Sequence, residues 1–183
     1  MESRKYLATV NGKSTKEYAL WYDMNRRCIP NGAVQIRRPS YIGCSVHPDF
    51  IKFQDFAEWC QHQIGFGSAG YDLDKDILVS GNKVYGPDTC VFVPREINIL
   101  LTHNRSNKGL YPVGVNYDTK RNKFQSKLSV GGKTVSLGWF STLNDAVDAY
   151  VNAKHKVIKQ TADIWKDKLD PRVYDALMHH TIV

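Results

Sequence analysis

Residues 123–140 read KFQSKLSVGGKTVSLGWF, and they determine the fold expected for the second half of the chain. Over residues 123–130, apolar or small side chains alternate with polar ones, which is typical of a strand that buries one face. Gly131 and Gly132 form a two-residue hairpin turn. Residues 133–140 then return as the next strand, so this stretch predicts an antiparallel hairpin.

The sequence on either side extends the hairpin to a small module. Residues 112–115 (PVGV) form a short strand before it. After it, Thr142 and Asp145 begin a helix whose apolar residues recur at helical spacing as far as Val157. We therefore expect a three-stranded antiparallel sheet packed on a helix over residues 111–160. A C-terminal helical extension follows over residues 161–183, with its helix beginning at Asp170-Pro171.

Two helices are expected near the start of the chain. Ser14 and Glu17 have the spacing of a capping box, which predicts a helix over about residues 15–28. A second helix follows a cap at Asp49, and the aromatic stripe within residues 53–60 is expected to lie in the core.

Two short strands and a helix come next. Residues 71–79 and 90–93 have the pattern of strands. Pro94 fits the start of a helix, where its missing N–H costs nothing. We assign residues 1–101 to one module and residues 102–110 (THNRSNKGL), which lack apolar periodicity, to a linker. The expected fold class is thus α+β.

The composition is that of an ordinary globular protein, with 42% hydrophobic and 23% charged residues over 183 positions. It excludes a wholly disordered or collagen-like chain. No apolar run approaches the roughly 20 residues that a membrane-spanning helix needs, and the first residues lack the apolar stretch of a signal peptide. We therefore expect a cytoplasmic protein with no membrane partner.

The four cysteines are expected to be thiols, because disulfides are rare in the cytoplasm. Cys44 and His47 have the spacing of a metal clamp, to which Cys28 and Cys90 would add two ligands of a structural Zn²⁺ site. Buried thiols without a metal are the alternative, and the sequence favours them because zinc sites normally show two clear pairs of ligands.

The charge of the chain points to a polyanionic partner. Lys and Arg number 25 against 18 Asp and Glu, a formal net charge of +7. Between His103 and Lys133 there are seven Lys or Arg and one acid, Asp118. Such clustering favours a nucleic-acid-binding face, because each cation that contacts a phosphate releases counterions. The alternative is a solvated basic surface with no partner.

Two parts of the chain resemble known families. In the first part, three runs resemble the ββα-metal site of HNH endonucleases: Leu73-Asp-Lys-Asp-Ile77, Pro87-Asp-Thr-Cys90 and Glu96-Ile-Asn98. Two runs before them resemble the helical lead-in of the phage homing members: Trp21-x-x-Met24-x-x-Arg27-Cys28 and Phe53-x-x-Phe56-x-x-Trp59. The second part resembles the DNA-binding domain of APETALA and ethylene-response factors, through Gly114-Val-Asn, Phe124, Gly132-Lys133, Leu137-Gly-Trp-Phe140 and Asp145-Ala-x-x-Ala149-Tyr150. The fold that these resemblances imply is an HNH-like module followed by a sheet-and-helix module.

The first resemblance implies a catalytic site with one divalent cation, Mg²⁺ or Mn²⁺. Asp74 would be the ligand at the end of the first strand and Asn98 the ligand on the helix, both offering the oxygen atoms that these cations prefer. Lys75 occupies the position of the general base and Thr89 that of the orienting asparagine. Because a lysine beside a cation stays protonated, Lys75 would instead neutralise the phosphate, with Asp76 (or Asp72) as base or additional ligand.

The second resemblance implies contacts with double-stranded DNA through outward-facing side chains of the strands. These are Asn116, Lys120, Arg121, Lys123, Gln125, Lys127, Lys133, Thr134 and Ser136. In the first module, Arg37 and Arg38 are either phosphate contacts or solvated side chains.

The favoured function is a sequence-directed DNA endonuclease of the phage homing type, acting in the host cytoplasm if a phage encodes it. The alternative is a non-enzymatic DNA-binding protein, regulatory or directed against host defences, in which the nuclease site has decayed. A third reading is a protein–protein module whose basic face binds an acidic partner. The sequence does not determine the oligomeric state, although a monomer is favoured.

Overall fold

The computed structural model describes residues 5–101 and 110–182, which form two compact units. The first unit contains the chain up to Arg95 together with Asp167–Ala176, and the second contains Glu96–Lys166 with the chain from Leu177. The predicted linker, residues 102–110, lies outside the described residues except for Leu110. Within the described residues, no helix combines the length and the apolar character that crossing a membrane requires.

The second unit contains the predicted three-stranded antiparallel sheet. Its strands are β7 (Val115–Asp118), β8 (Lys123–Val130) and β9 (Lys133–Phe140), in the order β7-β8-β9. Gly131 and Gly132 connect β8 to β9 with φ angles of +56° and +76°, values that a two-residue hairpin turn requires. The predicted hairpin is therefore confirmed.

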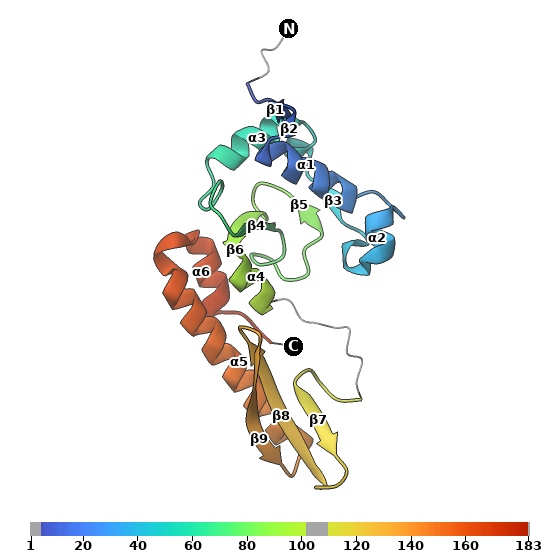
Figure 1. Ribbon diagram of the computed structural model, residues 1–183, viewed down its shortest axis with the longest axis vertical. Helices are drawn as coiled ribbons and strands as arrows, with labels where there is room; N and C mark the ends of the chain where they lie inside the picture. Colours follow the sequence, from blue (N-terminus) through green and yellow to red (C-terminus); the bar gives the residue numbers. More distant parts are fainter. Residues whose placement is uncertain (1–4, 102–109, 183) are drawn as a thin grey trace. The chain divides into compact units, whose positions relative to one another are not determined.

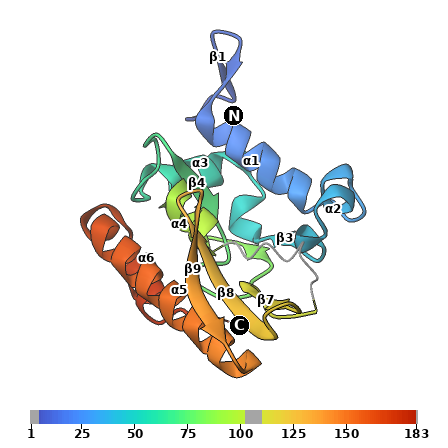
Figure 2. The same cartoon turned by 60° about the horizontal axis from the view of Figure 1, so that its bottom comes forward.

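One face of this sheet is covered by α5 (Leu143–Trp165), as Figure 1 and Figure 2 show. The hydroxyl of Thr142 accepts a hydrogen bond from the Asp145 backbone N–H at 3.2 Å and donates one to the Asp145 carboxylate at 2.7 Å. This cap confirms the predicted start of the helix. The helix continues past residue 160, the predicted end of the module, because buried positions such as Ala162 maintain its apolar face.

The first strand of the sheet begins later than the sequence predicts. A strand was expected over residues 112–115, whereas β7 begins at Val115. Gly114 has a φ of +82°, which no strand contains, and a Cβ at this position would overlap the ring of Tyr150 on α5. The chain therefore bends tightly against the helix before the strand starts.

Two shorter helices, α4 (Arg95–Leu101) and α6 (Pro171–Met178), lie where the chain passes from one unit to the other. In α4, the Leu100 carbonyl accepts a hydrogen bond from the ammonium of Lys154 on α5 at 2.6 Å. The helix starts one residue after Pro94, which belongs to the preceding strand. After the 3₁₀ turn η3 (Lys166–Lys168), α6 begins where the sequence predicts.

The N-terminal part of the first unit contains α1 (Lys16–Arg27), α2 (Ala33–Arg37) and α3 (Phe53–Gln61), and most of α6 also belongs to this unit. The cap of α1 is Thr15, whose hydroxyl accepts from the Tyr18 N–H at 3.4 Å. The predicted cap, Ser14, is instead the last residue of a strand.

The start of α3 also differs from the prediction. Asp49 lies in a 3₁₀ turn, η2 (Pro48–Phe50), and the N-cap of α3 is Lys52. The expected role of the aromatic stripe is confirmed: Phe56 and Cys60 are fully buried in the core of the first unit.

Three two-stranded sheets complete the first unit. They are β1 (Thr9–Val10) with β2 (Lys13–Ser14), β3 (Ser45–Val46) with β5 (Val84–Tyr85), and β4 (Tyr71–Asp74) with β6 (Val91–Pro94). The β3–β5 pair is parallel and the other two are antiparallel. A further 3₁₀ turn, η1 (Pro39–Tyr41), follows α2.

The predicted strand over residues 71–79 is shorter in the structure. It ends at Asp74, whose carboxylate oxygen Oδ1 accepts hydrogen bonds from the backbone N–H groups of Asp76 and Ile77, both at 2.8 Å. An aspartate that binds the backbone two and three residues ahead closes a turn. The alternation of residues 75–79 therefore lies in a loop.

Candidate nucleic-acid interface

The face of the β7–β9 sheet opposite α5 carries most of the predicted DNA-binding side chains. In an antiparallel sheet, residues that pair across strands project to the same face. Three rows cross the strands: Asn116 with Gln125 and Trp139, Lys127 with Ser136, and Ser129 with Thr134; Asp118 with Lys123 makes a fourth at the edge. We call these nine residues the open sheet face.

The other face is the buried one. Val115, Ser126 and Leu128 alternate with the residues of the open sheet face and are buried on the side of α5. A bulge at Ser126/Lys127 interrupts the register with β9 but preserves this alternation on β8. The sequence alternation thus predicted correctly which strand residues share a face.

Lys133 does not belong to the open sheet face. It pairs with Val130 across the hairpin turn, and both alternate with Ser129 and Thr134. The side chain of Lys133 therefore starts from the opposite side of the hairpin, although it is exposed at the tip.

The loop between β7 and β8 is folded around Asp118. Its carboxylate accepts the backbone N–H groups of Lys120 and Arg121 at 2.9 and 3.0 Å, and it pairs with the Arg121 guanidinium at 2.9 Å. The N–H groups and guanidinium of this loop lower the pKa of Asp118 below its usual value. The ammonium of Lys120 is exposed beside them.

Arg121 also lies over Trp139, with its guanidinium carbon 4.6 Å from the centre of the ring. Trp139 is on the open sheet face and remains about one-third exposed. A guanidinium stacked on an aromatic ring is held in place, and the N–H groups of Arg121 that do not bond to Asp118 can contact phosphate. The sequence set of binding residues omits Trp139: its place after Leu137-Gly138 is compatible with stacking on DNA, but packing at the strand end is the favoured interpretation of the sequence.

The predicted catalytic residues form a structural network around the loop after β4. Lys75 is buried, with 4% of its surface exposed, and its ammonium donates to the Asp76 carboxylate at 2.6 Å and to the Asn82 carbonyl at 2.8 Å. The same ammonium lies 5.6 Å from the centre of the Tyr85 ring. Lys75 therefore faces protein groups instead of a phosphate site.

Thr89 has a similar local role. Its hydroxyl donates to the Val84 carbonyl at 2.8 Å and accepts from the Gly86 N–H at 3.2 Å. These bonds fix the turn between β5 and β6, and the hydroxyl also meets the thiol of the neighbouring Cys90.

The predicted metal ligands, Asp74 and Asn98, belong to different units. Asp74 lies in the first unit and has one carboxylate oxygen engaged by two backbone N–H groups, whereas Asn98 lies on α4 in the second unit. Burial raises the pKa of Asp74 above its usual value, although the two backbone N–H groups and the nearby Lys75 ammonium act in the opposite direction.

Of the four candidate zinc ligands, Cys44 and Cys90 are buried, whereas Cys28 is half-buried and His47 is partly exposed. Among residues 5–101 and 110–182, no three His, Cys, Asp or Glu side chains come together in a way that would hold a metal ion. Burial raises the pKa of Cys28 to about 11 and that of Cys90 to about 12. His47 caps η2 by accepting from the Asp49 N–H at 3.3 Å.

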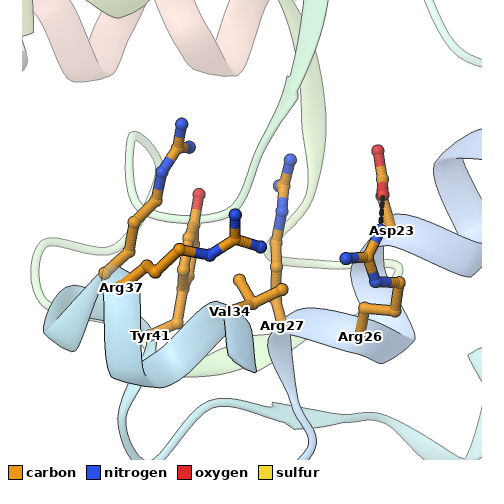
Figure 3. A pocket seen from close by; sticks show the side chains of 7 residues that line it. Asp23, Arg26, Arg27, Val34, Arg37 and Tyr41 are labelled. Carbon is orange, nitrogen blue, oxygen red and sulfur yellow. Dashed lines mark ion pairs between the residues drawn. The ribbon is translucent and has the colours of Figure 1, made fainter. Parts of the chain in front are cut away.

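A second basic site lies in the first unit, in a pocket of about 360 Å³ that we call the arginine pocket (Figure 3). Its walls come from the end of α1, from α2 and from η1, and its residues are Asp23, Arg26, Arg27, Val34, Arg37, Arg38 and Tyr41. The pocket unites the two predicted arginines, Arg37 and Arg38, with Arg26 and Arg27, which the site prediction omits. The repeated Arg-Arg pair in the sequence was the signal.

A comparison of the chain with protein families, with curated proteins and with solved structures found no match. The function is therefore inferred from the geometry of the open sheet face and of the arginine pocket.

Proposed function

We propose that the protein binds double-stranded DNA and that the open sheet face is the surface that contacts it. The observation that carries this proposal is the register of the three strands, which places Asn116, Gln125, Lys123 and Lys127 on the face that α5 leaves uncovered. Antiparallel strands fit the major groove of DNA. Lysine side chains there contact phosphates, and amide side chains such as Gln125 read the edges of bases.

The test compares two charge reversals in the full chain by fluorescence anisotropy with a labelled duplex. The double variant Lys123→Glu and Lys127→Glu should bind all duplex sequences at least tenfold more weakly, because these lysines lie on the proposed face. Log affinity of the parent should fall with log salt by roughly 0.9 per phosphate contact, and this slope should become shallower in the variant.

The matched control is Lys156→Glu with Lys159→Glu, which changes the net charge equally on exposed positions of α5. It should retain most of the parent affinity. If both double variants lose affinity to the same extent, binding follows net charge and the sheet is not the interface. Absence of duplex binding by the parent also contradicts the proposal.

DNA cleavage is the second candidate, and one observation favours it. The antiparallel pair β4–β6 is followed directly by α4, the element order that the endonuclease resemblance implies. DNA cleavage has less support than DNA binding, because the side chains of Asp74, Lys75 and Thr89 form hydrogen bonds within the protein. A nicking assay with Mg²⁺, Mn²⁺ and EDTA distinguishes the two: metal-dependent cutting that Asp74→Ala abolishes would make the protein an endonuclease.

A further inference from the structure

The arginine pocket concentrates positive charge that the protein itself does not neutralise. Four arginines and one carboxylate, Asp23, line it. Asp23 pairs with Arg26 at 3.7 Å. Arg27, Arg37 and Arg38 make no ion pair with a carboxylate among the described residues, so three guanidinium groups share one small hollow.

Several polar groups of the pocket point in the same direction. In Figure 3, the polar ends of Arg27, Arg37 and Tyr41 lie on the same side of the pocket. The guanidinium carbon of Arg27 lies 5.2 Å from the centre of the Tyr41 ring, and the Nε of Arg37 donates to the Ala33 carbonyl at 3.2 Å. These contacts restrict both side chains while leaving further N–H groups for a ligand.

A buried side chain holds the walls of the pocket in place. Gln35 is 5% exposed, and its amide group donates to the carbonyls of Arg27 and Tyr41, both at 3.1 Å. Its carbonyl oxygen accepts from the Asn31 N–H at 3.2 Å. The end of α1, the turn before α2 and η1 are thereby joined through one residue. Such a network preorganises the site, so little ordering is needed when a ligand binds.

We propose that the arginine pocket binds a doubly charged phosphate monoester. Planar guanidinium groups match phosphate oxygens in pairs, and a monoester carries close to two negative charges at neutral pH. The volume lies within the range of small-molecule sites, and Val34 with the Tyr41 ring offers an apolar wall for the esterified group. A phosphodiester inside a duplex carries one charge and continues on both sides, so a concave pocket suits it less well.

Two sources share this chemistry: a free small phosphate ester and the 5′-phosphate at the end of a nucleic-acid strand. This proposal does not rest on DNA binding by the open sheet face, because all residues of the arginine pocket lie in the first unit, whereas the sheet lies in the second. The two proposals can therefore fail separately.

The first measurement follows the thermal midpoint of the full chain with adenosine 5′-monophosphate, with adenosine, and with sodium chloride at matched ionic strength. Binding to the folded state raises the midpoint, so the monophosphate should raise it and adenosine should not. The second measurement compares a 5′-phosphorylated duplex with the same duplex ending in 5′-hydroxyl groups, in the Lys123→Glu and Lys127→Glu background. Tighter binding of the phosphorylated duplex assigns the strand end as the source.

Arg38→Gln is the decisive variant, because Arg38 is exposed and its guanidinium makes no hydrogen bond or ion pair within the described residues, whereas its backbone groups bond to Val34 and Tyr41. Loss of one charge-assisted contact should weaken phosphate binding roughly tenfold. Lys13→Gln removes an equal charge from an exposed strand outside the pocket and should change nothing. The proposal is overturned if neither phosphorylated ligand binds better than its unphosphorylated counterpart, or if both variants weaken binding equally.

Discussion

Lys75 shows how one buried charge can be structural in a position that a motif suggests is catalytic. Its ammonium bonds to Asp76 and to the Asn82 carbonyl, and Asn82 in turn donates from its side chain to the carbonyls of Lys75 and Val84, both at 2.7 Å. The loop after β4 is therefore closed through Lys75. Removing one partner of a buried ionic contact leaves the other groups without compensation.

We predict that Lys75→Ala lowers the free energy of unfolding by about 2–4 kcal/mol. Lys75→Met should lose less, because its apolar chain stays packed and no charge is buried. Asp76→Asn retains an acceptor but leaves the buried ammonium without its counter-charge, so it should also lower the free energy of unfolding, by about 1–3 kcal/mol. Urea unfolding followed by circular dichroism measures all three. Parent-like stability of Lys75→Ala would show that the buried ammonium is not a structural element.

The local sequence around these residues could not have revealed this role. The letters LDKDI fit a strand-end metal site, and they fit equally well a strand that ends in an aspartate-closed turn. The two cases differ in which backbone N–H groups Asp74 meets and in where Asn82, seven residues beyond Lys75, places its carbonyl. These are tertiary facts that no residue spacing encodes.

At the scale of elements, long periodic segments were predictable and short pairings were not. The alternation of β8 and the glycine pair after it specify a hairpin with one buried face, and the cap at Thr142 specifies where α5 begins. By contrast, β3 and β5 pair over only two residues each, from positions about 40 residues apart. A two-residue strand has no periodicity that a sequence could reveal. The arginine pocket is likewise built from short segments, and its Arg-Arg pairs are its only local signal in the sequence.

Two glycines of the second unit separate the cost of backbone conformation from the cost of packing. Both Gly114 and Gly131 have positive φ, but a Cβ at Gly131 would meet no atom within 4 Å, whereas one at Gly114 would overlap Tyr150 and lie 2.8 Å from the Lys127 carbonyl oxygen. Gly131→Ala should therefore cost only the conformational term, about 1–2 kcal/mol. Gly114→Ala should cost roughly 3 kcal/mol or more, because overpacking adds to that term.

Thermal unfolding of the two glycine variants tests this difference. The midpoint should fall further for Gly114→Ala than for Gly131→Ala. Equal midpoints would mean that the contact between the bend at Gly114 and α5 yields without cost, so it would not position β7.

At the scale of the whole molecule, the boundary between the two units differs from the module boundary expected at residue 101, because residues before it contact the second unit. The second unit begins at Glu96 and so includes nearly all of α4. The ammonium of Lys154 is 7% exposed and reaches the Leu100 carbonyl, and the Trp165 indole N–H donates to Glu96 at 3.1 Å. Burial also lowers the pKa of Lys154 from its usual value, so its hydrogen bond to Leu100 compensates an otherwise unfavourable environment.

A fragment of residues 102–183 should consequently be less stable than one of residues 96–183. The shorter fragment lacks the Leu100 carbonyl, and a buried donor without its acceptor costs about 1–3 kcal/mol. Thermal unfolding of both fragments, each with and without Lys154→Met, isolates this contribution. With methionine there is no ammonium to satisfy, so the difference between the two fragments should shrink. If it stays the same, α4 stabilises the unit through other contacts; if the unsubstituted fragments melt together, α4 contributes nothing, and the module boundary belongs after residue 101.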